Sequence, residues 1–246
     1  MFEIHLPSTD STNTYAKQHV SLLRSHPIAC ITAGEQTAGR GRFQRRWISP
    51  PHVNLYVTFY TRLSIHQLHL STLGLVLASS MARVLLAAGI HPQIKWPNDL
   101  QLNQKKFGGI LCETVQQGEF FDVFAGIGVN VNMEAEDLRL IGQPATSLKQ
   151  ETKKTWDRKQ LLQNLQVAFA KDLESFTQAG FAPFLGFCNS LLAYKGKEVR
   201  LLDGQREWTG ICHSLLDDGR LQIQLPDHSL HACVSGEVSL REVAEH

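Results

Sequence analysis

A short loop rich in glycine and arginine, from Gly39 to Trp47, carries the side chains with the clearest capacity for chemistry. Its four arginines are Arg40, Arg42, Arg45 and Arg46. Their forked donors suit phosphate or carboxylate groups, and the glycines let the backbone approach a ligand closely. Solvated turns and nonspecific nucleic-acid tails share this composition, so the loop alone predicts an anion site without identifying the anion.

Two polar motifs offer further ligand groups. Ser11, Thr12 and Asn13 stand at the expected start of a helix, where free N–H groups and the positive end of the dipole can hold a polar ligand. A plain N-cap is the open alternative. In Lys95-Trp96-Pro97-Asn98-Asp99, a cation, an amide and a carboxylate surround a proline-fixed turn. Its oxygens could hold Mg²⁺ or a ribose hydroxyl, or Asn98 and Asp99 could simply shape the turn.

Two glycine-containing segments look like strands that a ligand approaches. Lys106 precedes the pair Gly108-Gly109 at the start of an apolar run, where the lysine could meet a carboxylate or an α-phosphate. A β-bulge with solvated lysines is equally compatible. Between Gly126 and Asn132, residue types alternate with period two, so Gly126 and Gly128 would leave one strand face open to a flat apolar ligand. Tight packing or a bulge explains the same glycines.

Length and charge narrow the class of protein. The chain has 246 residues and a formal charge of +1, which gives no general attraction to nucleic acid or anionic membranes. Its five cysteines are separated and form no C-x-x-C pair, as in a reducing compartment. The sequence also shows no signal peptide, no membrane-length apolar run and no histidine pair with metal-ligand spacing. We therefore expect a cytoplasmic protein without membrane association.

The elements that must position these motifs form an α+β fold, a mixed β-sheet with helices. We expect helices from Ser11 or Thr12, over Leu68–Ala88 and over Asp157–Ala179. We expect strands at Ile28–Ala33, Val53–Tyr60, Pro92–Lys95, Phe107–Val115 and Phe120–Val131, the last two as a hairpin. The arginine loop thus lies between two strands.

After Tyr194 the pattern changes to short strands divided by turn residues. Strands are expected at Glu198–Leu202, Glu207–His213, Leu221–Leu225 and Leu230–Val234. About five short strands in some fifty residues indicate a small β-barrel. The predicted domains are therefore a larger α+β domain over 1–193 and a β-barrel over 194–246.

In combination and in this order, the motifs resemble the biotin protein ligase family. The diagnostic set is GRGR with a following RxW, KWPND, KxGGIL and GIGVNVN. The resemblance runs from Ser8 through the Ser235–Arg241 segment. It implies the class II synthetase-like fold that this family shares with lipoate ligases and octanoyltransferases, followed by a C-terminal SH3-like β-barrel.

The resemblance also implies the reaction. Family members join biotin to ATP, which gives biotinyl-5′-AMP and pyrophosphate, and then transfer biotin to one lysine of a biotin carboxyl carrier protein domain. ATP with its Mg²⁺ and biotin are the implied small molecules. The mixed anhydride is already activated, so the transfer needs the acceptor lysine close and aligned rather than an enzyme nucleophile.

Site roles follow by similarity, residue by residue. The biotin-binding set would be Ser11, Thr12, Asn13, Gln36, Arg40, Gly41, Arg42, Lys106, Gly109, Ile110, Gly126 and Gly128. The ATP-binding set would be Arg42, Arg45, Trp47, Lys95, Asn98 and Asn130. The catalytic residues would be Lys106, Arg40 and Arg42, and Asp99 is the candidate Mg²⁺ ligand.

The chain departs from the family pattern in two places. Gln44 stands where the family often has glycine, which predicts a stiffer arginine loop. There is no room before Ser11 for the winged-helix DNA-binding domain of many bacterial members, so we expect a monofunctional ligase that does not bind DNA. Exposed sheet edges could pair two copies as a homodimer. The alternatives are a lipoate ligase or octanoyltransferase, and a non-catalytic sensor of biotin or nucleotide.

Overall fold

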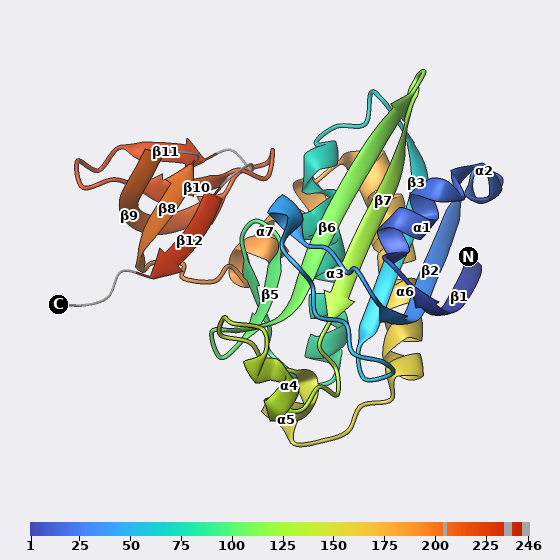
Figure 1. Cartoon of the computed structure of the whole chain (residues 1–246). Coiled ribbons are helices and arrows are strands. Elements are labelled where there is room, and N and C mark those ends of the chain that lie inside the picture. Colours follow the sequence, from blue (N-terminus) through green and yellow to red (C-terminus); the bar gives the residue numbers. More distant parts are fainter. Residues whose placement is uncertain (204–205, 234–237, 243–246) are drawn as a thin grey trace.

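The computed structural model of the chain describes residues 1–203, 206–233 and 238–242, and over these it forms two β-sheets (Figure 1). The larger has the strand order β1-β2-β3-β7-β6-β5-β4. Its strands are β1 (Phe2–Thr9), β2 (Ile28–Gln36), β3 (Leu55–Ser64), β4 (Gln93–Lys95), β5 (Asp99–Leu102), β6 (Lys105–Gln117) and β7 (Phe120–Val129). The β1 and β2 strands are parallel and every other neighbouring pair is antiparallel, so the sheet is mixed.

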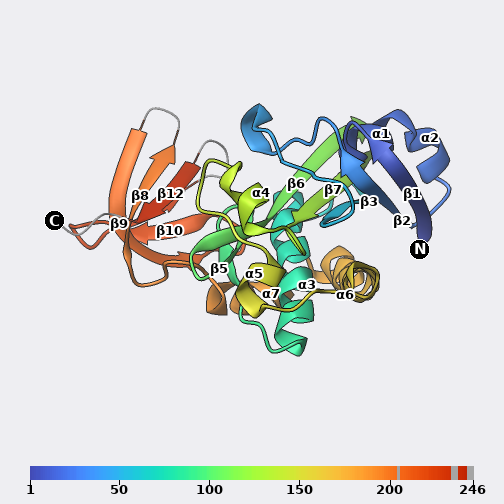
Figure 2. The ribbon, with the colours of Figure 1, turned by 60° about the horizontal axis from the view of Figure 1, so that its bottom comes forward.

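Helices lie on both faces of the large sheet. They are α1 (Thr12–Gln18), α2 (Val20–Leu23), α3 (Leu73–Ala87), α4 (Ala135–Arg139), α5 (Leu148–Thr152), α6 (Arg158–Ala179) and α7 (Ala182–Ser190), with 3₁₀ turns η1 (Arg42–Gln44) and η2 (Leu70–Thr72). Figure 2 shows α3 and α6 below the sheet and α1 and α2 above it. The arginine loop also lies above the sheet, on the same side as α1.

The period of two along β3 and β7 separates the two faces. Phe59 belongs to the main core and its ring lies 4.6 Å from that of Phe169 on α6. The neighbouring Thr58 points the other way and donates a hydrogen bond to Asn13 of α1. On β7, Ala125 and Ile127 likewise belong to the main core. Alternate residues of these strands therefore serve either the core or the face that carries the polar motifs.

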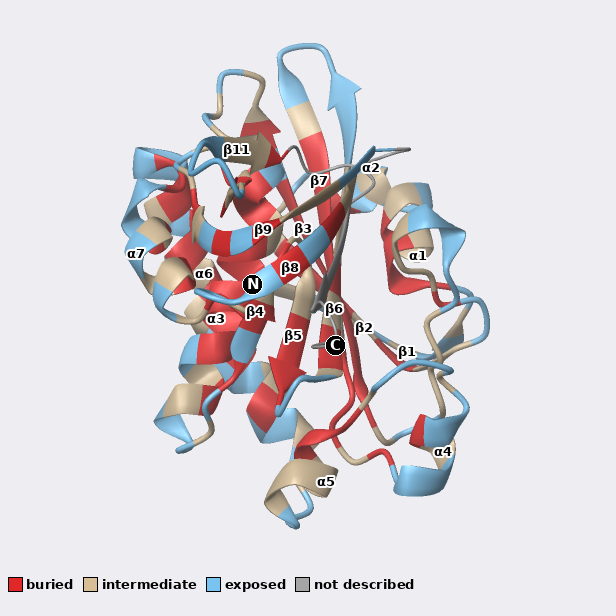
Figure 3. Cartoon of the chain, turned by 90° about the vertical axis from the view of Figure 1, so that its left-hand side faces the viewer, coloured by how far each residue is buried: buried red, intermediate tan, exposed pale blue. Residues whose placement is uncertain are grey.

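The buried residues lie where the helices cover the large sheet. Figure 3 shows buried residues along the central strands and on α3, whereas the hairpin tip between β6 and β7 is exposed. The segment Leu70–Ala87 is apolar and long enough to cross a membrane by composition, but 67% of it is buried inside the protein. It is therefore placed as the core helix of a folded domain.

The smaller sheet is antiparallel and has the strand order β11-β10-β9-β8-β12. Its strands are β8 (Glu198–Asp203), β9 (Arg206–Leu215), β10 (Leu221–Gln224), β11 (Leu230–Cys233) and β12 (Val238–Glu242). It contacts the large domain through the buried Trp96, whose Nε1 donates to the Gly219 carbonyl at 2.8 Å. The turn that carries Asn98 and Asp99 is thereby joined to the small sheet.

The sequence predicted the principal elements correctly, including the β6–β7 hairpin and the long α6 helix that begins at an Asp157 cap. It missed β1, β5, α4, α5 and α7, and the single helix expected from Ser11 or Thr12 is divided into α1 and α2. Of the terminal motif, Ser235 to Glu237 lie outside the described residues, while β12 carries the rest. The four strand ranges expected after Tyr194 correspond to β8, β9, β10 and β11, and β12 is the fifth strand.

Candidate active site

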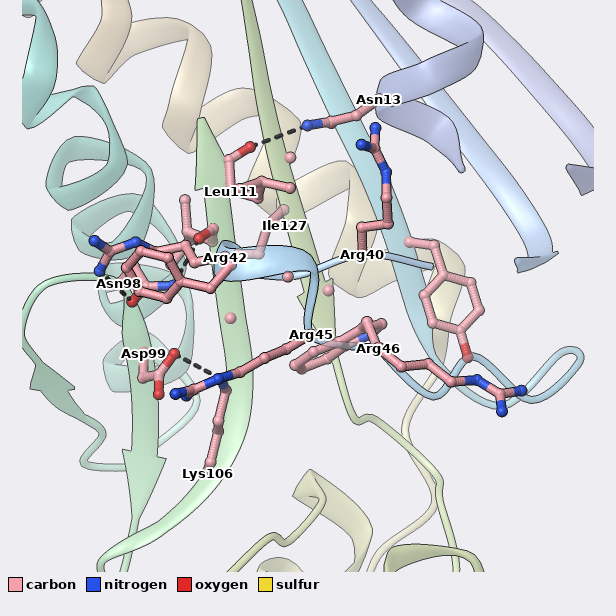
Figure 4. Close-up of a pocket in the computed structure, with 18 of the residues that line it drawn as sticks. Asn13, Arg40, Arg42, Arg45, Arg46, Asn98, Asp99, Lys106, Leu111 and Ile127 are labelled. Carbon is pink, nitrogen blue, oxygen red and sulfur yellow. Dashed lines mark hydrogen bonds and ion pairs between the residues drawn. The ribbon is translucent and has the colours of Figure 1, made fainter. Parts of the chain in front are cut away.

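A cavity of about 480 Å³ lies above the central strands, beneath the arginine loop. It brings together nearly all the residues selected from the sequence (Figure 4). Those lining it are Ser11, Thr12, Asn13, Gln36, Arg40, Gly41, Arg42, Arg45, Trp47, Lys95, Asn98, Asp99, Lys106, Gly109, Ile110, Gly126 and Gly128. Five segments far apart in the chain therefore converge on one space.

The start of α1 forms one end of the cavity. Ser11 holds the N-cap position, but no capping hydrogen bond to its side chain is formed within the described residues. The Thr12 N–H donates instead to Gln36 Oε1 at 2.9 Å, which ties the helix to the end of β2. Ser11, Thr12 and Asn13 are all at least 95% buried. The plain N-cap alternative therefore does not account for these side chains.

The arginine loop crosses the cavity and closes on itself. Gly41 N–H donates to the Arg45 carbonyl at 2.7 Å, and Trp47 N–H donates to the Gly39 carbonyl at 2.9 Å. Gln44 has a φ of 60°, in the left-handed region that favours glycine. The loop thus holds a residue other than glycine in a backbone conformation that glycine adopts more readily.

Two loop arginines point in opposite directions (Figure 4). Arg40 Nη2 donates to Thr14 Oγ1 on α1 at 3.0 Å, whereas Arg42 Nη1 donates to Asn98 Oδ1 at 3.4 Å. Burial lowers the pKa of the Arg42 guanidinium, although the charge of Asp99 acts in the opposite sense. The loop thus presents cations to both ends of the cavity.

The glycines of the cavity floor are covered by protein side chains. A Cβ at Gly128 would stand 2.5 Å from Trp47 Cε2, and one at Gly126 would stand 2.5 Å from Asn13 Oδ1. The tight-packing alternative therefore describes both positions, and the strand face is not open as we expected. Any ligand on this face lies alongside the indole of Trp47, whose Nε1 is buried and has no hydrogen-bond partner among the described residues.

Lys106 lies beside the turn that carries Asn98 and Asp99. Its Nζ lies 2.7 Å from Asp99 Oδ1 and 5.4 Å from the Trp47 ring centroid. The β5–β6 register shifts between Leu100 and Gln101, so the bulge alternative also holds for the backbone next to Lys106. The lysine is nevertheless only 18% exposed, rather than solvated.

Two of the predicted residues are placed differently from the others. Ile110 reaches the cavity, but its side chain belongs to the main core, on the α3 side of the sheet. Asn130 lies outside the cavity lining and is 98% buried, with its Nδ2 donating to the Thr146 carbonyl at 3.1 Å. Its expected role toward ATP stays a prediction.

Sequence reasoning missed several lining residues. They are Phe43, Arg46, Tyr56, Val57, Trp96, Pro97, Leu111, Ile127, Gly142, Gln143 and Pro144. The last three reach the cavity because Lys106 N–H donates to the Pro144 carbonyl at 3.0 Å, a pairing across distant segments. Glu113, which contacts Asn13, was also missed. Its signal was available in the period of two that continues from Gly109 through Leu111 along β6.

The chain offers a limited donor set for a metal. Among the described residues, no cluster of three or more His, Cys, Asp or Glu side chains could hold a metal ion. Asp99 and Asn98 supply one carboxylate and one amide at the edge of the cavity. Such a set fits Mg²⁺ that is held mainly by substrate phosphates and water.

Comparisons of sequence and of structure with known proteins both identify biotin protein ligases. Residues 5–130 match the biotin/lipoate A/B protein ligase family and residues 195–241 match the biotin protein ligase C-terminal domain. The chain is 37% identical to the bifunctional ligase/repressor BirA of Salmonella typhimurium, over 96% of this chain and 73% of that protein. It is 34% identical to the biotin–[acetyl-CoA-carboxylase] ligase of Paracoccus denitrificans, over 90% and 93% of the two chains.

A solved structure, the biotin protein ligase from Aquifex aeolicus in complex with biotin and ATP, superposes with a TM-score of 0.84. It is 32% identical and the match covers 98% of this chain and 99% of that one. The fold, including both sheets, therefore has a counterpart among solved structures. The chain belongs to the biotin/lipoate A/B protein ligase family.

Proposed function

We propose that the protein is an ATP-dependent biotin protein ligase that biotinylates a lysine of a biotin carboxyl carrier protein. The observation that carries this proposal is the position of Lys106, a cation only 18% exposed, in a cavity that also receives Arg40 and Arg42. A carboxylate and a polyphosphate can meet only where fixed positive charge offsets their repulsion.

In the first step, a biotin carboxylate oxygen attacks the α-phosphorus of ATP and the bond to the β-phosphate oxygen breaks. The products are biotinyl-5′-AMP and pyrophosphate. Lys106 is the central cation between the two anions, with Arg42 on the nucleotide side and Arg40 on the α1 side. The ion pair with Asp99 orients the Lys106 ammonium toward the cavity.

In the second step, the neutral amine of the acceptor lysine attacks the acyl carbon and AMP leaves. The reaction requires no nucleophile from the enzyme, because the acyl phosphate is already activated. The chain contributes by holding the anhydride away from water beneath the arginine loop until the acceptor arrives.

The remaining assignments of the biotin-binding and ATP-binding sets belong to this proposal. Ser11, Thr12, Asn13 and Gln36 form the end of the cavity toward biotin, over the glycine floor. Lys95, Asn98 and Arg45 lie on the nucleotide side. Asp99 and Asn98 would hold Mg²⁺, which neutralises part of the triphosphate charge when it is bound with ATP.

The proposal extends to the domain boundary, the location of the protein and its assembly. We place the domain boundary at 193/194, because the Ala193 N–H donates to the Ile94 carbonyl of the large sheet and β8 begins at Glu198. A cytoplasmic location is supported by the free thiols of Cys30, Cys112 and Cys188. Activity without DNA binding, and pairing of two copies at a sheet edge, would be tested by operator footprinting and by sedimentation.

Mass spectrometry of a carrier domain, incubated with the protein, ATP, Mg²⁺ and biotin, tests the function. We expect the carrier to gain one biotin with the wild type and with Lys105→Ala, an exposed neighbour, but not with Lys106→Ala. Exchange of labelled pyrophosphate into ATP isolates the first step. Exchange with lipoate and none with biotin would favour the lipoate ligase, and binding of biotin without exchange would favour the sensor.

A further inference from the structure

Glu113 lies on β6 beside the cavity and takes no part in the assignments above. Its carboxylate faces α1, where Oε2 accepts a hydrogen bond from Asn13 Nδ2 at 2.8 Å and Oε1 pairs with Lys17 Nζ at 2.5 Å. Arg40 Nη2 of the arginine loop lies 4.0 Å from Oε2. One partly buried carboxylate thus lies among three groups at the edge of the proposed biotin site.

The contact with Glu113 determines how the Asn13 amide is turned. Asn13 Nδ2 has two acceptors, Glu113 Oε2 and the Leu111 carbonyl, the latter at 3.1 Å. Asn13 Oδ1 faces the opposite way and accepts from Thr58 Oγ1 at 2.6 Å. A rotation by 180° would place Oδ1 against the carboxylate and the carbonyl, so it is strongly disfavoured. The second lone pair of Oδ1 remains available to a ligand N–H.

The Glu113 carboxylate is ionised near neutral pH. Burial alone would raise the pKa of Glu113, but the hydrogen bonds from Lys17 and Asn13 and the charges of Lys17 and Arg40 outweigh it, so the pKa lies below its usual value. An ionised carboxylate is an acceptor only, which leaves the Asn13 amide a single compatible orientation.

We infer that Glu113 is a positioning residue for biotin binding, which acts by fixing the orientation of the Asn13 amide. The inference rests on the proposed function, in which Asn13 contacts biotin. It separates two tasks of the same carboxylate: the hydrogen bond with Asn13 serves the ligand, whereas the ion pair with Lys17 serves only the attachment of α1 to β6.

Three variants test this division. Glu113→Ala removes both interactions, Glu113→Gln keeps an acceptor for Asn13 without the charge, and Lys17→Met removes the ion pair alone. We expect Glu113→Ala to raise the calorimetric Kd for biotin about tenfold, which corresponds to one charged hydrogen bond, while the KM for ATP is unchanged. Glu113→Gln and Lys17→Met should bind biotin within about threefold of the wild type. Should Glu113→Ala fail to fold, Glu113→Leu replaces it with similar volume and no acceptor.

Coupling to Asn13 supplies the decisive comparison. If Glu113 acts through Asn13, Glu113→Ala should weaken binding no further in an Asn13→Ala background. Full additivity, or a loss in Glu113→Gln equal to that in Glu113→Ala, would overturn the inference. If the wild type binds no biotin, the proposed function fails, and the side-chain amide resonances of Asn13 then decide: they should shift in ligand-free Glu113→Ala and stay in place in Lys17→Met.

Discussion

The indole of Trp47 lies directly on the backbone of Gly128, so closely that a Cβ at that position would stand 2.5 Å from Trp47 Cε2. The arginine loop and the central strand β7 therefore meet at one residue that has no side chain. This contact sets the height at which the loop lies above the sheet.

Gly128→Ala should displace the Trp47 indole and the loop with it. Because the added methyl has no room, we expect biotin binding to weaken about tenfold or more, the scale of a moderate overpacking cost. Calorimetry with biotin measures this effect. Gly186→Ala, at an exposed helical position with open space around its Cβ, is the matched control and should bind biotin normally. Wild-type affinity in Gly128→Ala would mean that the loop is free to move away without consequence.

Gln44→Gly should relieve the backbone of the arginine loop. A residue other than glycine in the left-handed region costs on the order of 1 kcal/mol. Glycine removes this cost, but its larger conformational entropy in the unfolded state offsets part of the gain. We expect a gain of up to about 1 kcal/mol in the free energy of unfolding by denaturant titration. Gln163→Gly, on the exposed face of α6, should lose about 1 kcal/mol. Slower release of the acyl-adenylate by Gln44→Gly would show that Gln44 also limits loop closure.

Asp122→Asn should change how stability depends on pH. The buried Asp122 carboxylate accepts from Tyr60 at 2.7 Å and pairs with Arg24 at 2.5 Å. Burial alone would raise its pKa, but these hydrogen bonds outweigh burial and lower the pKa below the usual value. Its contribution is therefore present above about pH 4 and is lost as the pH falls through the lowered pKa.

We thus expect Asp122→Asn to lose about 2 kcal/mol of unfolding free energy near pH 7, and the difference from the wild type to shrink below about pH 4. Denaturant titrations across this range measure both. Glu119→Gln, at the exposed hairpin tip, should keep the wild-type free energy of unfolding near pH 7. If Asp122→Asn lowers the free energy of unfolding equally at every pH, the effect of the substitution comes from packing and not from the charge of the carboxylate.

Trp96→Phe should weaken the contact between the two sheets. The substitution leaves the Gly219 carbonyl without its indole donor in a buried setting, so we expect about 1–3 kcal/mol lower unfolding free energy. The KM for ATP should rise, since the Asn98–Asp99 turn follows directly. Trp208→Phe, which affects a half-buried ring of the small sheet, should alter neither quantity. An unchanged KM for ATP would show that the hydrogen bond between Trp96 and Gly219 contributes to stability alone.

Local sequence patterns predicted most of the fold because each principal helix or strand carries its signal within a few neighbouring residues. The Asp157 cap, the apolar stripe of α6 and the turn before Phe120 are all such signals. The short β5 strand was missed because Asp99 belongs to a proline-containing turn motif, whereas pairing with β4 on one side and β6 on the other makes the segment extended. The β1 strand alternates between half-buried and exposed residues, a strand pattern that is already visible in the sequence from Phe2 to Leu6.

Motifs in the sequence selected most of the predicted residues that line the cavity, but they did not predict how those residues assemble. Nothing near Gly128 in the sequence indicates that Trp47, some eighty residues earlier, lies on it. The pairing of Lys106 with Pro144 depends likewise on a connection between distant segments. Asn130 was selected by its neighbours in a motif, although it is buried outside the cavity lining, where its Nδ2 donates to the Thr146 carbonyl.

The alternation along β7 has a consequence for insertions and deletions. Gly126 and Gly128 face the cavity while Ala125 and Ile127 face α3 and α6, so a register slip by one residue would exchange the two sets. Ile127 would then enter the space of Trp47, and a glycine would leave a hole in the core. The length of the β6–β7 hairpin is therefore as restricted as the identity of its residues, even though its tip is exposed and lies outside the cavity lining.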